Sequence, residues 1–244
     1  MRRFYAPPEQ FSGQNIELGL EETRHLRNVL RLREGDEINV FDGEGREFLC
    51  KVEQIEKKRA GLIILSGTDP SSPESSLELN LAAGLLKGDK FDLVVQKSVE
   101  LGISRIQPLF TKRCDVRSNA GNSKIERWRK IALEAAKQSG RAKLMPVDVP
   151  VEFEDFIRSF ESSPADGESR ILFTERAGKG LANIQELNKI TAVVGPEGGW
   201  DDDELSFAKS YEFDLVTLGG RILRTETAAI SIAAILQHRF GDLS

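Results

Sequence analysis

Cysteine, histidine, methionine, tryptophan and tyrosine are scarce in this sequence of 244 residues, where each occurs only twice. Cys50 and Cys114 lie far apart and have no metal-ligand spacing, so the sequence predicts no metal site and a reducing, cytoplasmic environment. His25 lies in the N-terminal part and His238 near the C-terminus, so we expect both to be structural. A histidine is therefore not the expected general base of an enzyme built on this chain.

Long apolar segments are absent as well. No stretch approaches the 18 apolar residues that indicate a membrane-spanning helix. The N-terminal stretch MRRFYAPPEQ is basic but no apolar run follows it, so it does not have the pattern of a signal peptide. The phosphate-binding patterns G-x-x-x-x-G-K-[ST] and G-x-G-x-x-G are missing too. The sequence therefore predicts neither a membrane protein nor a P-loop or dinucleotide-binding turn.

Charge is distributed unevenly along the chain, whose net charge is −5. Residues 87–145 carry 14 basic and 6 acidic side chains, whereas residues 146–220 carry 6 basic and 16 acidic ones. A positive segment inside an acidic protein can bind a polyanion, or it can form a solvated helix surface. Composition alone leaves both interpretations open.

Serine, proline and glycine concentrate in GTDPSSPESS, residues 67–76, which predicts an exposed linker. Before it, short apolar runs with Gly or Asp-Gly punctuation accompany one helix at 21–30, a pattern typical of a small β-barrel. After it, unbroken apolar runs alternate with helices, which predicts an α/β domain with a mostly parallel sheet covered on both faces. The expected domains are 1–68 and 77–244, with a linker at 69–76.

The α/β domain has recognisable helix ends. Asp89 and the capping-box pair Ser123 and Glu126 mark two helix starts, and Gly102 and Gly140 mark two helix ends. The expected strands of this domain lie at 77–86, 104–110, 170–174, 190–195 and 214–219, and the expected helices at 89–102, 123–140, 201–210 and 227–238. Ligands of such sheets bind at the carboxyl ends of the strands, which points to the loops FTERAG, VVGPEGGW and LGGRILRTET.

The turn Gly-Pro-Glu-Gly-Gly at 195–199 carries the strongest local signal. Gly195, Gly198 and Gly199 permit unusual backbone angles and the close approach of a ligand to main-chain amides, although a tight turn without a ligand would also use them. The acidic residues at 201–204 would repel a phosphate but suit a helix N-terminus. We therefore expect the pocket to hold a neutral or cationic group, chiefly by main-chain contacts.

Several motifs resemble those of one enzyme family over nearly the whole chain. RRFY and HLRNVLRLREGDEINVFDG resemble a PUA-like N-terminal domain, and QKSVELGISRIQPL, EAAKQSGR, VGPEGGW and LGGRILRTETA resemble catalytic-domain motifs in the same order. The chain thus resembles the SPOUT methyltransferases with a deep trefoil knot. Among them, it is most similar to the enzymes that methylate ring nitrogen 3 of a uridine in small-subunit ribosomal RNA. One departure is Lys137, where the resemblance implies an acidic residue.

The resemblance implies S-adenosylmethionine as the cofactor, wrapped by the loop that precedes the last helix. LGGRIL would contact the adenine through its main chain, with Ile222 and Leu223 as apolar walls. The apolar helix TAAISIAAILQ would pack at the interface of a homodimer. The implied cofactor-binding residues are Leu172, Thr174, Val194, Gly195, Pro196, Glu197, Gly198, Gly199, Leu218, Gly219, Arg221, Ile222, Leu223 and Thr225.

Arg224 and Glu226 are the candidate catalytic residues. Methyl transfer to a uracil nitrogen is an in-line displacement that requires alignment and a deprotonated imide. Arg224 would stabilise the negative charge that develops on the uracil oxygens, and Glu226 would accept the proton directly or through water. The alternative is an ion pair between the two side chains that only holds the loop.

Basic side chains supply the implied RNA contacts, because phosphate contacts position an RNA without reading its sequence. The candidates are Arg2, Arg3, Arg24, Arg27, Arg31, Lys112 and Arg113, together with Arg33, Arg117, Lys124, Arg127, Arg129 and Lys130. The target base must be unpaired or flipped to reach a pocket. Two other functions stay open: a SPOUT methyltransferase that modifies a different RNA nucleotide, and a non-catalytic RNA-binding or ribosome-assembly protein.

Overall fold

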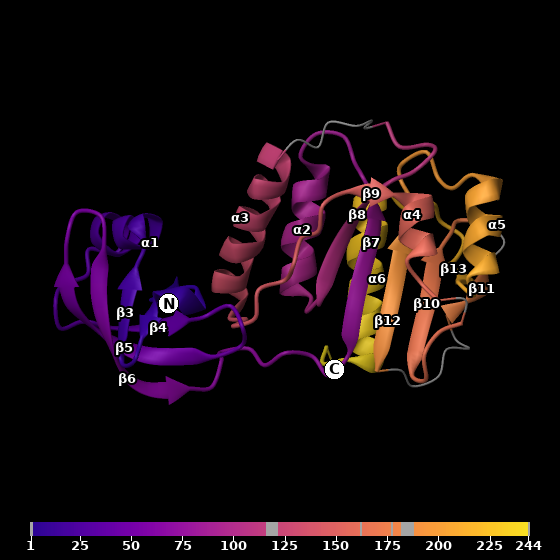
Figure 1. Cartoon of the computed structure of the whole chain (residues 1–244). Helices are drawn as coiled ribbons and strands as arrows, with labels where there is room; N and C mark the ends of the chain where they lie inside the picture. Colours follow the sequence, from indigo (N-terminus) through magenta and orange to yellow (C-terminus); the bar gives the residue numbers. More distant parts are fainter. Residues whose placement is uncertain (1, 116–121, 162, 177, 182–187, 244) are drawn as a thin grey trace. The chain divides into compact units, whose positions relative to one another are not determined.

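The chain forms two compact units (Figure 1). The N-terminal unit contains residues 1–74 and 136–144, and the C-terminal unit contains residues 75–135 and 145–244. The computed structural model describes residues 2–115, 122–161, 163–176, 178–181 and 188–243, so Arg117 lies outside the described residues. The N-terminal unit thus has a second piece, far along the chain, that the expected boundary at residue 68 does not include.

The N-terminal unit is built on a six-stranded sheet in the order β1-β4-β5-β6-β3-β2. These strands are β1 (Arg3–Tyr5), β2 (Phe11–Ser12), β3 (Asn15–Leu18), β4 (Glu37–Phe41), β5 (Glu47–Ile55) and β6 (Ala60–Thr68). Strand β1 pairs with β4 in parallel, and the other pairs are antiparallel. Register shifts between β5 and β6 mark bulges, which bend a sheet. Strands β1 and β2 are the edges of this curled sheet, so the described strands form a half-barrel, in agreement with the small β-barrel domain that the sequence predicts.

One helical segment packs against this half-barrel. The short turn η1 (Pro8–Gln10) follows β1, and α1 (Leu20–Arg24) continues directly into a π-helical turn, η2 (His25–Val29). Leu26 on η2 is fully buried and joins a core formed mainly by Phe4, Leu18, Ile38 and Leu62. The alternation of buried and exposed residues along β3 is the usual pattern of a strand with one face on a core.

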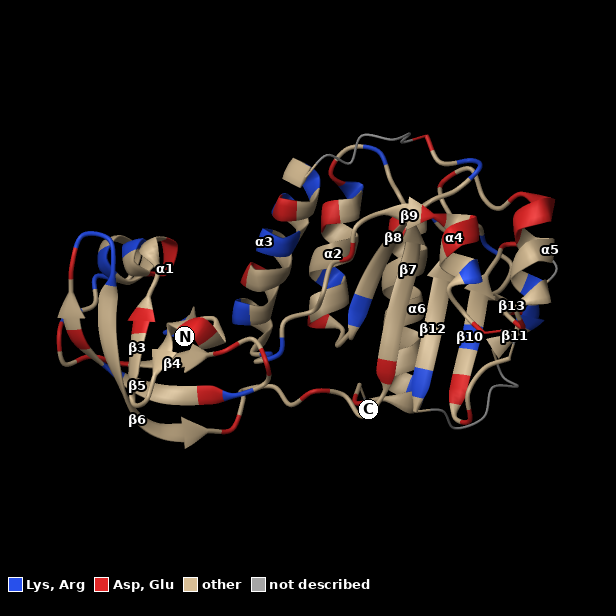
Figure 2. Cartoon of the chain, in the orientation of Figure 1, with Lys and Arg blue, Asp and Glu red and all other residues tan. Residues whose placement is uncertain are grey.

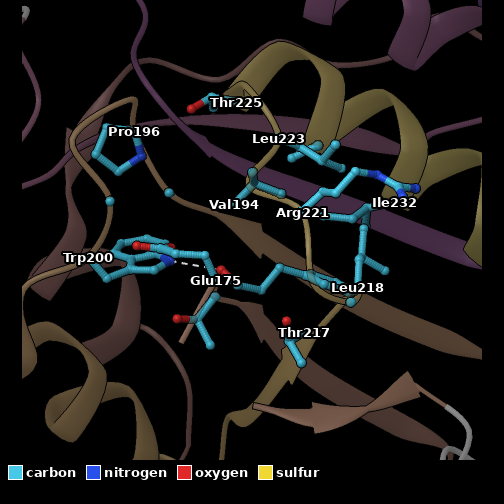
Figure 3. A pocket seen from close by; sticks show the side chains of 16 residues that line it. Glu175, Val194, Pro196, Trp200, Thr217, Leu218, Arg221, Leu223, Thr225 and Ile232 are labelled. Atoms are coloured by element: carbon cyan, nitrogen blue, oxygen red, sulfur yellow. Dashed lines mark hydrogen bonds between the residues drawn. The ribbon is translucent and has the colours of Figure 1, made fainter. Parts of the chain in front are cut away.

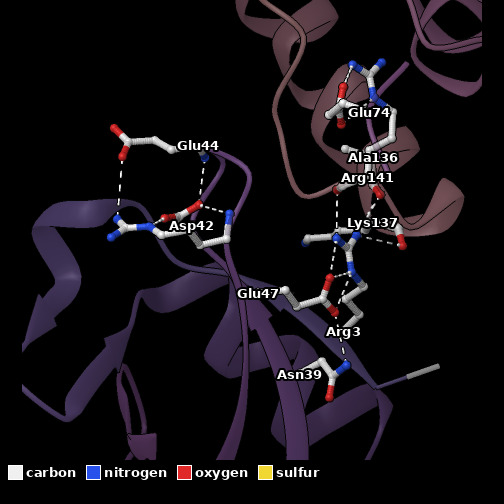
Figure 4. Close-up of polar contacts among 10 residues, drawn as sticks. Arg3, Asn39, Asp42, Glu44, Glu47, Glu74, Ala136, Lys137 and Arg141 are labelled. Carbon is white, nitrogen blue, oxygen red and sulfur yellow. Dashed lines mark hydrogen bonds and ion pairs between the residues drawn. The ribbon is translucent and has the colours of Figure 1, made fainter. Parts of the chain in front are cut away.

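Arg3 joins the two pieces of the N-terminal unit (Figure 4). Its side chain is 1% exposed and forms an ion pair with Glu47, with Nη2 and Oε2 separated by 3.0 Å. It also donates hydrogen bonds of 2.8 Å to the carbonyl oxygens of Ala136 and Arg141, and its guanidinium lies 4.1 Å from the ring centroid of Phe41. The prediction that Arg3 binds RNA is therefore wrong, because its donors already have buried protein acceptors.

The second piece also makes contacts with the predicted linker. The amide of Ser72 donates to the carbonyl of Gly140 at 3.1 Å, and Arg141 Nη2 lies 2.6 Å from a carboxylate oxygen of Glu74. Lys137, where the resemblance implies an acidic residue, forms an ion pair with Glu22. Residues 72–74 are thus attached to the N-terminal unit.

The C-terminal unit contains a seven-stranded sheet in the order β11-β13-β10-β12-β7-β8-β9. Its strands are β7 (Glu78–Gly84), β8 (Arg105–Phe110), β9 (Val151–Glu152), β10 (Glu168–Phe173), β11 (Lys179–Gly180), β12 (Lys189–Val194) and β13 (Asp214–Thr217). Each of the pairings between them is parallel. The parallel α/β sheet that the sequence predicts is therefore confirmed, and its strands end at one common edge.

Helices cover both faces of this sheet. They are α2 (Lys90–Glu100), α3 (Asn122–Ser139), α4 (Phe153–Arg158), α5 (Asp202–Ser210) and α6 (Thr225–Phe240). Helix α6 packs on β7 and β12 beside α2, whereas α4 contacts β8 and α5. Leu172, Val193 and Leu215 join one core cluster with side chains from α4 and α5. Because successive strand residues point to opposite faces, their neighbours Phe173 and Val194 point to the α6 side.

The helix ends follow the sequence signals only in part. Asp201 caps α5 in a capping box with Glu204, and Figure 2 shows the acidic start of this helix. Asp89 stands at the N-cap of α2 but its side chain makes no capping hydrogen bond. Helix α3 begins at Asn122, so Ser123 lies inside the helix and is not its cap. None of the helices in the described part of the chain is long and apolar enough to cross a membrane.

Candidate active site

A pocket lies at the carboxyl ends of β10, β12 and β13, where the parallel-sheet rule predicts a ligand site. The first two turns of α6 form its remaining wall (Figure 3). The lining residues are Phe173, Thr174, Glu175, Val194, Gly195, Pro196, Gly199, Trp200, Thr217, Leu218, Gly219, Arg221, Leu223, Thr225, Ala228 and Ile232. All three loops that the sequence singles out contribute to this list.

Glycine allows the loops of the pocket to pack through their main chains. A Cβ on Gly84, at the end of β7, would lie 2.7 Å from the backbone nitrogen of Pro196, and one on Gly195 would lie 2.9 Å from the Trp200 ring. Such approaches are closer than side chains tolerate. The indole Nε1 of Trp200 donates a 2.9 Å hydrogen bond to the carbonyl of Phe173. This bond fixes the turn at 195–199 to the end of β10.

The loop before α6 is more open. Gly219 has φ +119°, a backbone conformation that favours glycine, and a Cβ there would meet no atom within 4 Å. Arg221 and Leu223 line the pocket from the same loop. The pocket is therefore rigidly packed on its 195–200 side and accessible on its 218–224 side.

The structure places most of the sequence-predicted cofactor residues around this pocket. Those that line it are Thr174, Val194, Gly195, Pro196, Gly199, Leu218, Gly219, Arg221, Leu223 and Thr225. Six further lining residues were not predicted: Phe173, Glu175, Trp200, Thr217, Ala228 and Ile232. The spacing of Thr225, Ala228 and Ile232 is that of one helix face, so periodicity alone would have indicated the last two.

Four predicted cofactor residues lie outside the lining. Leu172 is fully buried in the cluster with α4 and α5, because strand alternation turns it away from the pocket. Ile222 is 85% exposed and forms no apolar wall. Glu197 forms an ion pair with Lys90 instead. Gly198 packs against Arg113, whose Cβ would lie 2.9 Å from a Cβ placed on this glycine.

The two candidate catalytic residues stand at the start of α6. Arg224 is exposed at the N-cap of this helix, between the lining residues Leu223 and Thr225. Glu226 is half-buried, and its Oε2 is buried without a hydrogen-bond partner. Because this oxygen has no partner in the described part of the chain, the alternative of an ion pair between Arg224 and Glu226 that holds the loop has no support.

Carboxylates neutralise much of the positive segment at 87–145. Lys112 contacts Asp201 at 3.2 Å and Asp203 at 2.7 Å, and Arg113 contacts Asp201 at 3.3 Å. The hydrogen bonds that Lys112 donates to Asp203 and Asp201 raise the pKa of Lys112. The hydrogen bond from Lys112 also lowers the pKa of Asp201. Arg127 is likewise paired, with Asp89 and Asp92. An RNA phosphate would therefore have to compete with the acidic start of α5 for Lys112 and Arg113.

In the N-terminal unit, the remaining candidates for RNA contacts lie on the surface. Arg2, Arg24, Arg27 and Arg31 are all exposed, and Arg31 has φ +52°, an uncommon backbone angle for a residue with a side chain. Val29, between Arg27 and Arg31, is an exposed apolar side chain. Arg24, Arg27 and Arg31 lie on or next to η2, so the helix that the sequence predicts does present its basic residues to solvent.

Metal-ligating groups do not cluster within the ranges that the structure describes: no set of three His, Cys, Asp or Glu residues there could hold an ion. Cys50 and Cys114 are free and buried. The pocket instead combines main-chain groups, apolar side chains, three threonines, Arg221 and one carboxylate, that of Glu175. Such a site suits an organic ligand with a planar apolar part.

Comparisons with known proteins agree with this geometry. Residues 73–237 match the model of an RNA methyltransferase domain, and residues 19–65 match that of an RNA methyltransferase PUA domain. The chain is similar to ribosomal RNA small subunit methyltransferase E of Synechocystis, with 34% identity over 96% of this chain and 76% of that protein. The protein of the same name from Bacillus subtilis is 30% identical over 90% of this chain and 88% of its own length.

Two of the solved structures that cover nearly the whole chain hold S-adenosylmethionine. One is ribosomal RNA small subunit methyltransferase E from Neisseria gonorrhoeae bound to S-adenosylmethionine, with 36% identity, a TM-score of 0.89 and full coverage of both chains. The other is a methyltransferase from Legionella pneumophila in complex with the same cofactor, with 33% identity, a TM-score of 0.89 and 99% coverage of both chains. The parallel sheet, the pocket at its carboxyl edge and these matches together show that the chain belongs to the RNA methyltransferase family with an N-terminal PUA domain.

Proposed function

We propose that this protein transfers the methyl group of S-adenosylmethionine to ring nitrogen 3 of a uridine in small-subunit ribosomal RNA. One observation carries the proposal: the pocket between the loops at 195–200 and 217–225, in a chain that matches solved cofactor-bound relatives over nearly its full length. The nitrogen and the base come from the family resemblance of the sequence motifs, which include LGGRILRTETA.

The residues of the pocket suit this cofactor. A neutral adenine needs main-chain hydrogen bonds and apolar contact, which Leu218, Gly219 and Leu223 can supply. Gly195 and Gly199 let the side chains of Trp200 and Glu175 pack against the main chain of the turn, because these glycines carry no side chain. A cluster of basic side chains would repel a cationic sulfur. Arg221 is the single basic lining residue in the described part of the chain. The proposal includes a deep trefoil knot in the C-terminal unit, as the family resemblance implies.

The chain's own residues then prepare the uridine. When bound, S-adenosylmethionine supplies a methyl group on a positively charged sulfur. Arg224 extends from the N-cap of α6 beside the pocket and stabilises the uracil oxygens as the imide proton leaves. Glu226, whose Oε2 has no hydrogen-bond partner, accepts that proton directly or through water. A guanidinium keeps its charge at every working pH, so it acts by electrostatics and not by proton transfer.

RNA binds in this proposal through exposed basic side chains. Arg2, Arg24, Arg27 and Arg31 of the N-terminal unit contact phosphates, as do Lys112 and Arg113 of the C-terminal unit. The base itself is unpaired or flipped when it enters the pocket. Each such contact contributes to affinity and to its salt dependence, and not to sequence recognition.

The proposed assembly is a homodimer that acts in the cytoplasm. Helix α6 packs beside α2, and each helix exposes a large apolar side chain, Ile235 on α6 and Leu93 on α2. Side chains of this kind on adjacent helices favour a contact with a second copy of the chain. The free, buried cysteines are consistent with a reducing compartment.

The test is a map of methylated nucleosides in ribosomal RNA from cells with and without the gene. The proposal expects one N3-methyluridine of the small subunit to disappear and to return when the purified protein and S-adenosylmethionine are added to that RNA. Loss of a different methylated nucleotide would replace the proposed target. Unchanged RNA, with no cofactor binding in calorimetry, would support a non-catalytic RNA-binding protein instead.

A further inference from the structure

Glu175 supplies the one carboxylate among the described lining residues of the pocket. It follows β10, and Figure 3 shows it beside Trp200 on the side of the 195–200 turn. Its Oε1 lies 2.7 Å from the position that a Cβ on Gly199 would occupy, and Gly199 has φ +69°. The carboxylate therefore lies directly against the main chain of the turn, in space that exists because residue 199 has no side chain.

The charge of Glu175 is compensated only weakly by its surroundings. It forms an ion pair with Arg176, whose Nε lies 3.7 Å from Oε1 and whose side chain is 71% exposed. The neighbouring carboxylates have closer basic partners, Lys90 for Glu197 and Lys112 for Asp201. Arg221 is the other ionisable residue of the lining and stands on an exposed loop. The Glu175 side chain is 33% exposed and lines the pocket, so its charge can act on a ligand bound there.

The cofactor and its product differ in charge but hardly in shape. S-adenosylmethionine carries a positive sulfur, a positive ammonium and a negative carboxylate. After transfer, S-adenosylhomocysteine has lost the methyl group and the positive charge on sulfur, while its adenine, ribose and amino-acid parts are unchanged. Contacts to those shared parts bind both molecules equally. A negative charge in the pocket is the kind of group that can tell them apart.

We propose that the Glu175 carboxylate is the specificity-determining group by which the pocket binds S-adenosylmethionine in preference to S-adenosylhomocysteine. This inference rests on the proposed function, because it assigns the pocket to that cofactor. A lower affinity for S-adenosylhomocysteine favours its release after methyl transfer and limits inhibition by this product. Two unit charges about 4 Å apart change an affinity by about fivefold at the dielectric constant of water and by up to about a thousandfold at that of a protein surface, so a tenfold preference is within reach of one carboxylate.

The experiment is isothermal titration calorimetry of both ligands with the full-length protein and with Glu175→Gln. Glutamine keeps the size and the hydrogen-bonding oxygen of the side chain but removes its charge. The Kd of S-adenosylmethionine is expected to rise about tenfold, or 1.4 kcal/mol, and that of S-adenosylhomocysteine to stay within about twofold. Unchanged product binding also reports that the variant is folded. The matched control is Asp202→Asn, which removes an exposed carboxylate outside the lining and should change neither Kd.

Four outcomes separate this inference from its alternatives. An equal loss for both ligands would mean that Glu175 binds a shared group such as the ribose hydroxyls, and no loss for either would mean that it only packs on Gly199; both overturn the inference. A preference that weakens as salt is raised supports it, since charge interactions are screened. Failure of the unmodified protein to bind either ligand would instead contradict the proposed function.

Discussion

Replacing Arg3 with alanine should destabilise the N-terminal unit more than any change of an exposed arginine. The variant leaves the Glu47 carboxylate, whose side chain is 0% exposed, with one side-chain donor, Asn39 Nδ2 at 3.0 Å. The carbonyls of Ala136 and Arg141 lose their 2.8 Å hydrogen bonds at the same time. Removing one partner of a buried ion pair costs about 3–5 kcal/mol. We expect a loss of about 4 kcal/mol, a large share of the roughly 5–15 kcal/mol that stabilises a domain.

The measurement needs local resolution because two compact units need not unfold together. Hydrogen exchange, measured across a urea titration on peptides from 136–144 and from β4 and β5, reports the stability of the N-terminal unit separately. Arg2→Ala is the control: Arg2 is 54% exposed and its ion pair with Asp36 is 3.8 Å long, so we expect a change within about 0.5 kcal/mol. Arg3→Met combined with Glu47→Leu should lose less than Arg3→Ala, because no charge stays buried without a partner. Equal stability of Arg3→Ala and Arg2→Ala would refute the reasoning.

Three further predictions concern the pocket and the core. Gly219→Val should weaken S-adenosylmethionine binding about tenfold, because valine adopts the φ of +119° poorly; a calorimetric change within about twofold, or 0.4 kcal/mol, would contradict the site. Arg224→Ala should slow single-turnover methylation on the order of 100-fold while the cofactor still binds. A higher pH should restore part of this rate because more uracil is then deprotonated, whereas normal turnover would remove Arg224 from the mechanism. Burial raises the pKa of the Cys50 thiol to about 12, so Cys50 should react with thiol reagents at pH 8 only after unfolding; rapid labelling of the native protein, followed by mass spectrometry, would show that the site opens.

The sequence was sufficient for the parts of the fold that depend on local patterns. Unbroken apolar runs predicted the parallel sheet, and the acidic start of α5 predicted a helix N-terminus, which the capping box of Asp201 and Glu204 confirms. The carboxyl-edge rule located the three loops of the pocket. Short elements such as β9 and β11 were missed, because two residues carry no periodicity.

Individual side chains were harder to assign where two patterns compete. Leu172 and Phe173 are both apolar residues at the end of one strand. Only the alternation of side chains between the two faces of the sheet decides that Phe173 reaches the pocket. Arg3 looked like a phosphate ligand because nothing in its local sequence indicates Glu47, Ala136 or Arg141 as its partners. Long-range contacts of this kind appear only when the chain is folded.

The division of the N-terminal unit into two pieces affects how the protein is made. A ribosome adds roughly 5–20 residues per second, so the 70 residues from 75 to 144 take about 4–14 s to follow residue 74. During that interval the nascent half-barrel has no carbonyls from Ala136 and Arg141 to accept the donors of Arg3. The unit that is synthesised first is therefore completed late. A shortened gene for this unit alone would need to encode residues 136–144 after residue 74, joined by a linker.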